Sequence, residues 1–357
     1  MPKILNVETA IPPYCIKQEE VAVFAENLFS ENFRDIKRLL PVFQNGDIES
    51  RHFVHDIDWF KKPRSFKEKN DSFIEKAVEL GTEAIRKCVE NTEFATYSTI
   101  DAIFTVCTTG LATPSIEARI MNHLPFPEHV KRIPIWGLGC AGGASGLSRA
   151  YEYCLAFPKA NVLVLTIELC SLTFQHGDRS KSNLIGTSLF ADGTACTLIS
   201  GEESQCVKNA KKPLAKIFAT QSTTMKNSLD VMGWDVRDDG LFVIFSKDIP
   251  AIIEDWFKPN VEKLLCKHDL SLKDIKHFIA HPGGKKVIEA YGTSLQLDDS
   301  LLDSSRGILR EFGNMSSATI QYVLQDHLNK DIQAGDIGLG AALGPGFSSE
   351  LLLMRWE

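Results

Sequence analysis

The sequence contains no apolar run long enough to span a bilayer, and the segment after Met1 lacks the apolar core of a secretory signal. It also lacks an excess of basic residues, because 46 acidic side chains against 39 basic ones give a net charge of −7. An acidic chain has no general attraction for nucleic acid or anionic lipid. We therefore expect a cytoplasmic protein that does not bind nucleic acid and does not insert stably into a membrane.

The nine cysteines are not paired at the spacings typical of zinc sites. The sequence therefore gives no reason to expect a metal ion. Thiols in a cytoplasmic chain stay reduced, so we expect free cysteines and no disulfides. With 357 residues, the chain is long enough for two domains or for one large duplicated fold.

One stretch, from Trp136 to Arg149, has a β-like run that ends at glycines and turns into a helix directly behind Cys140. A helix N-terminus offers unpaired N–H groups and the positive end of the helix dipole, which stabilise a reactive thiolate. Gly137 and Gly139 permit a tight turn there. On these residues alone, a buried and inert cysteine is an equally good interpretation.

The order of predicted elements starts again after a charged segment from Glu202 to Pro213, which divides the chain into residues 1–212 and 213–357. In each half, glycine and small residues lead into a helix, at Gly139-Cys140 and at Gly313-Asn314. Such duplication would bring the two helix starts into one cavity. Periodicity predicts strands at Lys3 to Ala10, Thr99 to Val106, Asn161 to Ile167, Lys216 to Ser222 and Ile275 to Ala280, and helices at Ser30 to Phe43, Asp71 to Val89 and Ile249 to His268.

Three polar residues lie beside glycines at predicted strand or helix ends: Cys140, His281 and Asn314. Taken singly, His281 is equally well a turn histidine, and Asn314 is equally well a helix N-cap. Together they can perform one reaction. The cysteine attacks an acyl thioester, while His and Asn N–H groups stabilise the enolate that decarboxylation of a malonyl thioester produces. The enolate then attacks the bound acyl group and forms a carbon–carbon bond.

Four ordered motifs resemble those of the type III polyketide synthases, the chalcone synthase-like group. They are Trp136-Gly-Leu-Gly-Cys-Ala-Gly-Gly143, Ile279-Ala-His-Pro-Gly-Gly284, Gly313-Asn-Met-Ser-Ser-Ala318 and Gly344-Pro-Gly346. The resemblance covers essentially the whole chain. The sequences of the segments Ile133 to Gly139 and Lys181 to Phe190 are most similar to those of bacterial alkylpyrone synthases of bacilli. The resemblance implies an α/β fold of the thiolase-like αβαβα type with pseudo-duplicated halves, a homodimer, acyl-CoA and malonyl-CoA as substrates, and no cofactor.

The resemblance also implies roles for individual residues. Cys140 matches the acyl-carrying nucleophile, and His281 and Asn314 match the decarboxylation pair. Phe190 matches a gatekeeper aromatic between the coenzyme A tunnel and the cavity, although a core phenylalanine is the common alternative. The positions that match the cavity lining are Thr109, Thr173, Gly186 and Ser316, and Arg51 lies where the family places a contact to coenzyme A phosphates.

Several positions depart from the plant enzymes of this group. The second gatekeeper phenylalanine aligns with Val243, between Phe242 and Phe245. The cyclisation loop contains Leu343 before Gly344, Pro345 and Gly346, and Thr113 replaces a methionine that reaches into the partner's cavity. These changes suit an aliphatic starter better than an aromatic one. We therefore expect a fatty acyl starter, malonyl extension and an alkylpyrone-type product.

Other functions are compatible with the same residues. A single-round 3-ketoacyl synthase shares the three polar residues, although its histidine and asparagine contexts differ. A chalcone or stilbene synthase-like enzyme would take an aromatic starter. An inactive dimer that binds acyl chains is the alternative outside enzymology, and the presence of all three reactive residues argues against it.

Overall fold

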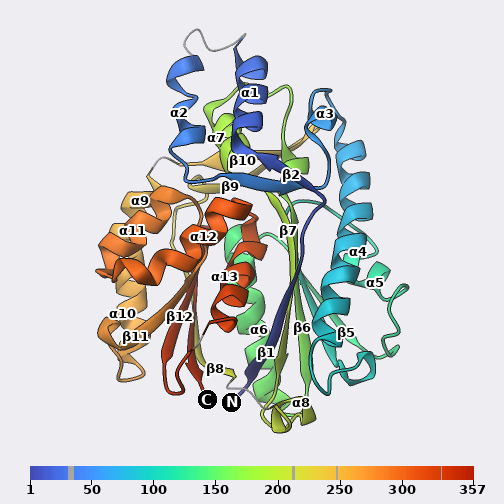
Figure 1. Ribbon diagram of the computed structural model, residues 1–357, viewed down its shortest axis with the longest axis vertical. Coiled ribbons are helices and arrows are strands. Elements are labelled where there is room, and N and C mark those ends of the chain that lie inside the picture. Colours follow the sequence, from blue (N-terminus) through green and yellow to red (C-terminus); the bar gives the residue numbers. More distant parts are fainter. Residues whose placement is uncertain (31–35, 211–213, 247, 331) are drawn as a thin grey trace.

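The computed structural model describes residues 1–30, 36–210, 214–246, 248–330 and 332–357. Helices and sheet alternate in five layers across the molecule (Figure 1). Both chain termini lie at one end of the layers, and short helices and hairpins cover the opposite end. The αβαβα arrangement expected from the sequence is therefore present.

Nine strands of the described residues form one mixed sheet, in the order β11-β12-β13-β8-β1-β7-β6-β4-β5, and β2 with β3 and β9 with β10 form two separate pairs. Strands β1 and β8 share only two residue pairs, so the sheet separates there into two parts. The part with the order β1-β7-β6-β4-β5 comes from the first half of the chain, and the part with the order β11-β12-β13-β8 comes from the second half. The strands are β1 (Lys3–Ala10), β4 (Ala102–Val106), β5 (Lys131–Ile135), β6 (Asn161–Leu169), β7 (Asp192–Ser200), β8 (Ala215–Thr224), β11 (Ile275–Ala280), β12 (Ile337–Gly344) and β13 (Ser348–Trp356).

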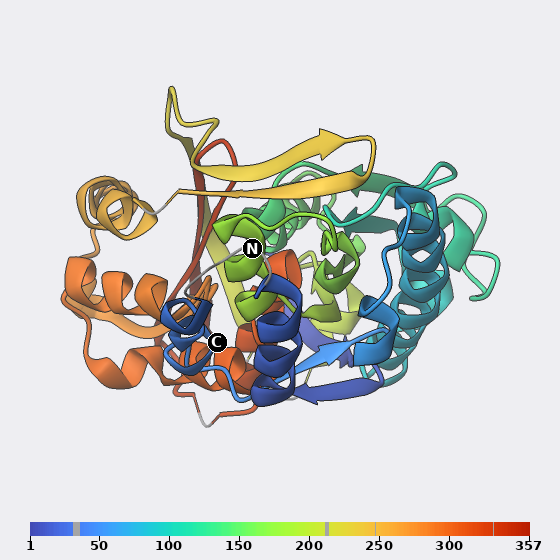
Figure 2. The same cartoon turned by 90° about the horizontal axis from the view of Figure 1, so that it is seen from above.

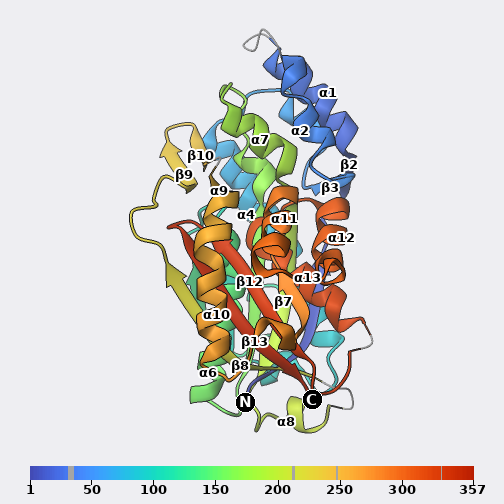
Figure 3. The same cartoon turned by 90° about the vertical axis from the view of Figure 1, so that its left-hand side faces the viewer.

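The central layer contains α6 (Gly142–Ala156) and α13 (Thr319–Leu328), which lie between the two parts of the sheet (Figure 1). Their apolar residues pack in one cluster with residues from both parts. Helix α4 (Phe66–Glu90) covers the outer face of the first part. The outer face of the second part is covered by α10 (Lys258–Cys266), α11 (Lys285–Leu295) and α12 (Asp303–Phe312), as Figure 3 shows from the side.

Local sequence explains why these elements form. Strand β6 is buried along its whole length, as its uninterrupted apolar run predicts, and it pairs parallel with β4 and antiparallel with β7. Helix α4 begins at a capping box in which Ser65 and Glu68 satisfy each other's backbone N–H groups. Strand β6 matches its predicted range within two residues, whereas α4 begins at Phe66, before the predicted start at Asp71, because the capping box fixes its first turn there.

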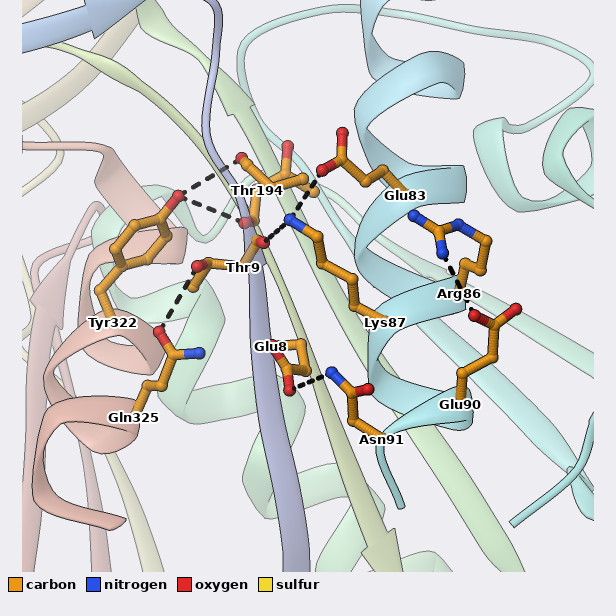
Figure 4. A network of polar contacts seen from close by, with 11 residues as sticks. Glu8, Thr9, Glu83, Arg86, Lys87, Glu90, Asn91, Thr194, Tyr322 and Gln325 are labelled. Carbon is orange, nitrogen blue, oxygen red and sulfur yellow. Dashed lines mark hydrogen bonds and ion pairs between the residues drawn. The ribbon is translucent and has the colours of Figure 1, made fainter. Parts of the chain in front are cut away.

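Strand β1 is held from both sides by polar contacts (Figure 4). From α4, Lys87 Nζ donates to the Thr9 carbonyl at 3.2 Å, and Asn91 donates to Glu8 at 2.9 Å. From α13, the Gln325 side chain accepts from the Thr9 hydroxyl at 3.4 Å and donates to the Val7 carbonyl at 2.9 Å. Outer helix, sheet and central helix are thus connected through one strand.

The described part of the predicted helix from Ser30 to Phe43 is not one continuous helix, because a 3₁₀ turn at Ile36–Arg38 is separated from a short helix by Leu39 and Leu40. The helix in this region is α1 (Gln18–Phe29), which buries Val21, Ala25 and Phe29 at helical spacing. A short helix, α2 (Pro41–Gln44), begins at its proline, because proline lacks the N–H that a helix interior requires. Residues 31–35 and the predicted domain boundary between 212 and 213 lie outside the described residues.

The covered end of the layers contains most of the remaining short elements. From above, the hairpin of β9 and β10 crosses the molecule beside α7 (Figure 2). None of the described helices is both long and apolar enough to cross a bilayer. The elements at the covered end are β2 (Tyr14–Lys17), β3 (Ser50–Phe53), α3 (Ile57–Phe60), α7 (Lys181–Leu189), β9 (Met232–Arg237), β10 (Gly240–Phe245) and α9 (Ile249–Ile252). Helix α5 (Ile116–Ile120) lies beside α4, and α8 (Gln205–Lys208) lies at the end that carries the chain termini.

Candidate active site

Cys140 lies in a single 3₁₀ turn, Gly139–Ala141, that leads directly into α6. Gly137 and Gly139 have φ values of 91° and 47°, which L side chains rarely adopt. A Cβ atom on Gly139 would also lie 2.7 Å from Pro345 Cδ. The predicted tight turn at the N-terminus of a helix is therefore present, and the glycine-proline loop closes over it.

The second half of the chain brings Asn314 and Ser316 to this turn. The Cys140 Sγ atom lies 3.6 Å from Ser316 Oγ. The Asn314 side chain accepts from the Ser316 backbone N–H at 2.8 Å and donates to the Gly283 carbonyl at 3.0 Å. Asn314 therefore connects the cysteine side of the site with the His-Pro-Gly-Gly loop.

His281 follows the last residue of β11. Its backbone N–H donates to the Ala341 carbonyl at 2.8 Å, which extends the sheet by one residue. The ring is 2% exposed, and neither ring nitrogen has a hydrogen-bond partner among the described residues. Buried polar groups are almost always paired in folded proteins, so a buried imidazole without a partner is a candidate for contact with substrate.

Burial determines the protonation of both groups. It raises the pKa of the Cys140 thiol to about 12, against a smaller lowering by the Ser316 hydrogen bond. Burial also lowers the pKa of His281 to about 3. The thiolate expected from the helix N-terminus is therefore not the resting form, because loss of hydration outweighs the stabilisation that the helix end provides. Thiol and imidazole are both neutral at pH 7.

Glu168, at the end of β6, lies directly behind the site and is fully buried. Its carboxylate accepts from the Thr108 backbone N–H at 3.1 Å, from Thr109 Oγ1 at 2.9 Å and from Ser317 Oγ. Burial raises its pKa to about 7, although these hydrogen bonds oppose the rise. One buried acid thus joins loops from both halves of the chain.

Phe190 lies at the C-terminal end of α7. A Cβ atom on Gly186 would lie 3.5 Å from its ring and 3.4 Å from Val243, so the three predicted positions are adjacent. The Phe190 ring also lies 5.5 Å from the ring of Phe245 and 6.0 Å from that of Trp234. Phe245 and Val243 lie on the same face of β10. The ring of Phe245 therefore packs beside Phe190, although the residue that aligns with the second gatekeeper phenylalanine is Val243.

Arg51, the predicted contact to coenzyme A phosphates, lies inside the protein and not at its surface. The side chain is 1% exposed, and its Nη1 atom donates to the Thr187 and Phe190 carbonyls, at 2.7 Å each. Arg51 therefore holds the end of α7 and the backbone of Phe190 in place. Burial lowers its pKa to about 9, while Asp192 opposes this, and the guanidinium stays charged at pH 7.

The other predicted lining residues also have defined positions. Thr109 accepts from the Leu169 N–H at 2.9 Å, and Thr173 donates to the Cys170 carbonyl at 2.8 Å. A Cβ atom on Gly344 would lie 2.5 Å from the Leu138 carbonyl oxygen, so glycine is required where this loop meets the cysteine turn. Gly346 has a φ of 114°, which also favours glycine.

Sequence reasoning missed several residues of the site. Glu168 lies near the end of an otherwise apolar strand, and a charged residue in such a strand could have been recognised from the sequence as a candidate for the site. Cys170, 2% exposed, lines the same pocket as Phe190 and Gly186, and nothing in its local sequence marks it. Trp234 is brought in by the pairing of β9 with β10. Within the described residues, no group of three or more His, Cys, Asp or Glu side chains is placed to hold a metal ion.

The layered fold, with a cysteine at the start of the central helix, places the protein among the thiolase-like acyltransferases. Family models narrow this class. The model of the N-terminal domain of chalcone and stilbene synthases matches residues 1–203, and that of the C-terminal domain matches residues 216–356. The chain therefore belongs to the chalcone and stilbene synthase family, the type III polyketide synthases.

Individual relatives agree with this assignment. A chalcone synthase-like protein of Bacillus subtilis is 55% identical, over 99% of this chain and 98% of its own. A 1,3,6,8-tetrahydroxynaphthalene synthase of Streptomyces peucetius is 32% identical, over 99% and 93%. The crystal structure of the Streptomyces coelicolor 1,3,6,8-tetrahydroxynaphthalene synthase superposes with a TM-score of 0.93 at 27% identity and covers 99% of both chains.

The raised pKa of Glu168 predicts a pH-dependent stability. The folded chain binds this proton more tightly than the unfolded chain, so the stabilisation is complete below pH 4.5 and disappears as the pH rises through 7. The difference amounts to about 3 kcal/mol of unfolding free energy. Glu168→Gln should remove this part of the change of the unfolding free energy with pH, measured by urea unfolding at a series of pH values between 4.5 and 7.5. The exposed variant Glu262→Gln should keep the wild-type slope, and an unchanged slope in Glu168→Gln would disprove the assignment.

The neutral thiol predicts slow alkylation. In the free protein, iodoacetamide should label Cys140 at least about 100-fold more slowly than the exposed Cys15 at pH 7.5, because only the thiolate reacts. The rate at Cys140 should still be rising at pH 10. Peptide mass spectrometry separates the two sites in one sample. A plateau for Cys140 below pH 8 would show that the thiolate forms in the resting site.

Proposed function

We propose that the protein loads an acyl group from coenzyme A onto Cys140 and extends it with malonyl-CoA by decarboxylative condensation. The observation that supports this most directly is the hydrogen bond of Asn314 to Gly283, which joins the cysteine side of the site to the loop of His281. Since both reactive groups are neutral, the thiol passes its proton to the neutral imidazole as sulfur attacks the thioester. Free coenzyme A leaves with a proton.

His281 and Asn314 then bind the malonyl unit. A neutral imidazole has one N–H group, and the Asn314 amide has a second N–H besides the one that Gly283 accepts. Aimed at the thioester oxygen, these donors stabilise the enolate that remains when carbon dioxide leaves. The enolate carbon attacks the acyl group on Cys140, and the sulfur is released as the new carbon–carbon bond forms.

We propose a fatty acyl starter and an alkylpyrone-type product. Support comes from the smaller Val243 at the second gate position and from the apolar pocket beside Phe190. Relatives of this chain are named for other products, 1,3,6,8-tetrahydroxynaphthalene and phloroglucinol, so membership of the family leaves the starter open. We place the reaction in the cytoplasm, consistent with nine cysteines that are all free thiols.

The assay combines purified protein, labelled malonyl-CoA and a series of acyl-CoA starters from acetyl to palmitoyl, with a cinnamoyl-type starter for comparison. We expect extended products from medium or long alkyl starters, identified by mass spectrometry. Cys140→Ala should abolish them, and Asn314→Ala should keep acyl loading but slow decarboxylation about 100-fold. The exposed variant Cys266→Ala is the control. A product of one condensation without a ring would favour a 3-ketoacyl synthase, and no product from any starter would overturn the proposal.

We also propose that two copies pair through β5. This strand ends the sheet order, so one side of it has no partner strand among the residues that the structure describes. Apolar side chains that are unusually exposed gather around it, including Trp136 at 49%, Leu111 at 43% and Phe157 at 49%. Exposed apolar surface beside an open sheet edge is typical of a homodimer interface.

Light scattering and mass photometry test the pairing. The wild type should be a dimer at micromolar concentration, and Trp136→Glu should raise the dissociation constant at least about tenfold, because it buries a charge at the interface. Leu229→Glu is the matched control, since Leu229 is 82% exposed on a different surface. A monomeric wild type, or equal weakening in both variants, would contradict an interface at β5.

A further inference from the structure

A pocket behind Phe190 extends away from Cys140 toward α1 and α3. Most of its lining is apolar, and aromatic rings form much of its wall. Arg51 is the one charged side chain among the described residues that line it. The apolar and aromatic lining residues on the side of α1 and α3 are Val21, Phe24, Phe53, Ile57, Phe60 and Phe174.

The guanidinium of Arg51 is only partly used by the protein. Nη1 donates to the Thr187 and Phe190 carbonyls, whereas Nε and Nη2 have no hydrogen-bond partner. Nε and Nη2 form the side edge of the guanidinium, whose parallel N–H bonds match the two oxygens of a carboxylate. Both nitrogens are shielded from water in the ligand-free chain, so they are donors that already lack hydration.

The neighbouring acid does not occupy these donors. Asp192 interacts electrostatically with Arg51, but its oxygens accept from the Val54 N–H at 2.8 Å and from the N–H and hydroxyl of Ser171 at 2.7 and 2.6 Å. Asp192 thus partly balances the charge and leaves the side edge open to another anion. Such an arrangement is unusual, because charged groups in a protein interior are normally paired.

We infer that Arg51 binds the carboxylate at the end of an apolar chain, with the chain lying against the aromatic wall of the pocket. A carboxylate brings one charge and two oxygens, which the two free N–H groups satisfy. A phosphate would bring more charge and further oxygens than this apolar pocket has donors for. Because Nη1 also holds the Phe190 carbonyl, a bound chain would steady the gate.

Two sources could supply such a chain. Phe24 and Ile57 also line an exposed groove that contains Lys61 and His176, and they separate this groove from the pocket. A free fatty acid can therefore enter the pocket from the groove between Phe24 and Ile57. Alternatively, a chain on Cys140 can pass Gly186 and present a terminal carboxylate to Arg51. The chemistry at Arg51 is the same in both cases, and binding of the free acid does not depend on the proposed condensation.

Calorimetry with the whole protein tests the site. Decanoic acid should bind at least about tenfold more tightly than 1-decanol, which has the same chain without the carboxylate. Arg51→Gln should abolish this preference, and Arg51→Lys should restore part of it, because one ammonium replaces the two-donor edge. Lys61→Gln, which removes the positive charge of the adjoining groove, should leave the preference unchanged.

A second variant separates binding from folding. Ile57→Trp narrows the pocket while keeping Arg51, and it should weaken the acid and the alcohol together; circular dichroism and melting temperature check that each variant is folded. The inference is overturned if the acid has no preference over the alcohol in the wild type, or if the preference survives Arg51→Gln. It is also overturned if only Lys61→Gln removes it.

The same variants distinguish the two sources. If the terminal carboxylate of a starter is bound, the mono-CoA ester of decanedioic acid should be a better starter than decanoyl-CoA in wild type but not in Arg51→Gln. If free fatty acid is bound, decanoic acid should bind equally well to Cys140→Ala, and the two starters should not differ. Inactivity with both starters would count against the proposed condensation, whereas the calorimetric result would still decide the carboxylate site.

Discussion

The contact on which the site depends is the close approach of the two central helix starts. A Cβ atom on Gly143 would lie 2.1 Å from the Ser317 carbonyl oxygen, so backbone meets backbone with no room for a side chain. This contact fixes the distance between the turn of Cys140 and the loop of Asn314 and Ser316. Each side chain of the site then requires only a rigid position on its own element.

Burial is the second constraint, and it changes the chemistry of every group at the centre. The rise in the pKa of the Cys140 thiol from 9.0 to about 12 corresponds to about 4 kcal/mol against the thiolate. A helix N-terminus typically contributes less than this to an anion, about 0.3–2 kcal/mol. The site therefore keeps its groups neutral and dry until substrate arrives, and the charge that forms during reaction meets N–H donors in a low-dielectric cavity.

Arg51 shows how one residue can carry a different role from the one its sequence position suggests. A basic residue near a predicted tunnel suggests a phosphate contact, but the fold buries Arg51 beneath α7. There, one guanidinium nitrogen holds the Phe190 backbone, and the others remain available. Arg51 thus contacts both the backbone of the gate residue Phe190 and the pocket behind it. The sequence around Phe190 does not indicate this connection.

The sequence by itself determined the family, the layered fold, the order of most elements and the positions of Cys140, His281 and Asn314, because glycine-rich turns and apolar periodicity are local signals. The helix at Gln18–Phe29, the protonation of the site, Glu168 behind it and the burial of Arg51 were decided only by the tertiary structure. The physical reason is that loss of hydration and the partners of a polar group depend on residues distant in the chain. No local pattern records which of these will cover a given side chain.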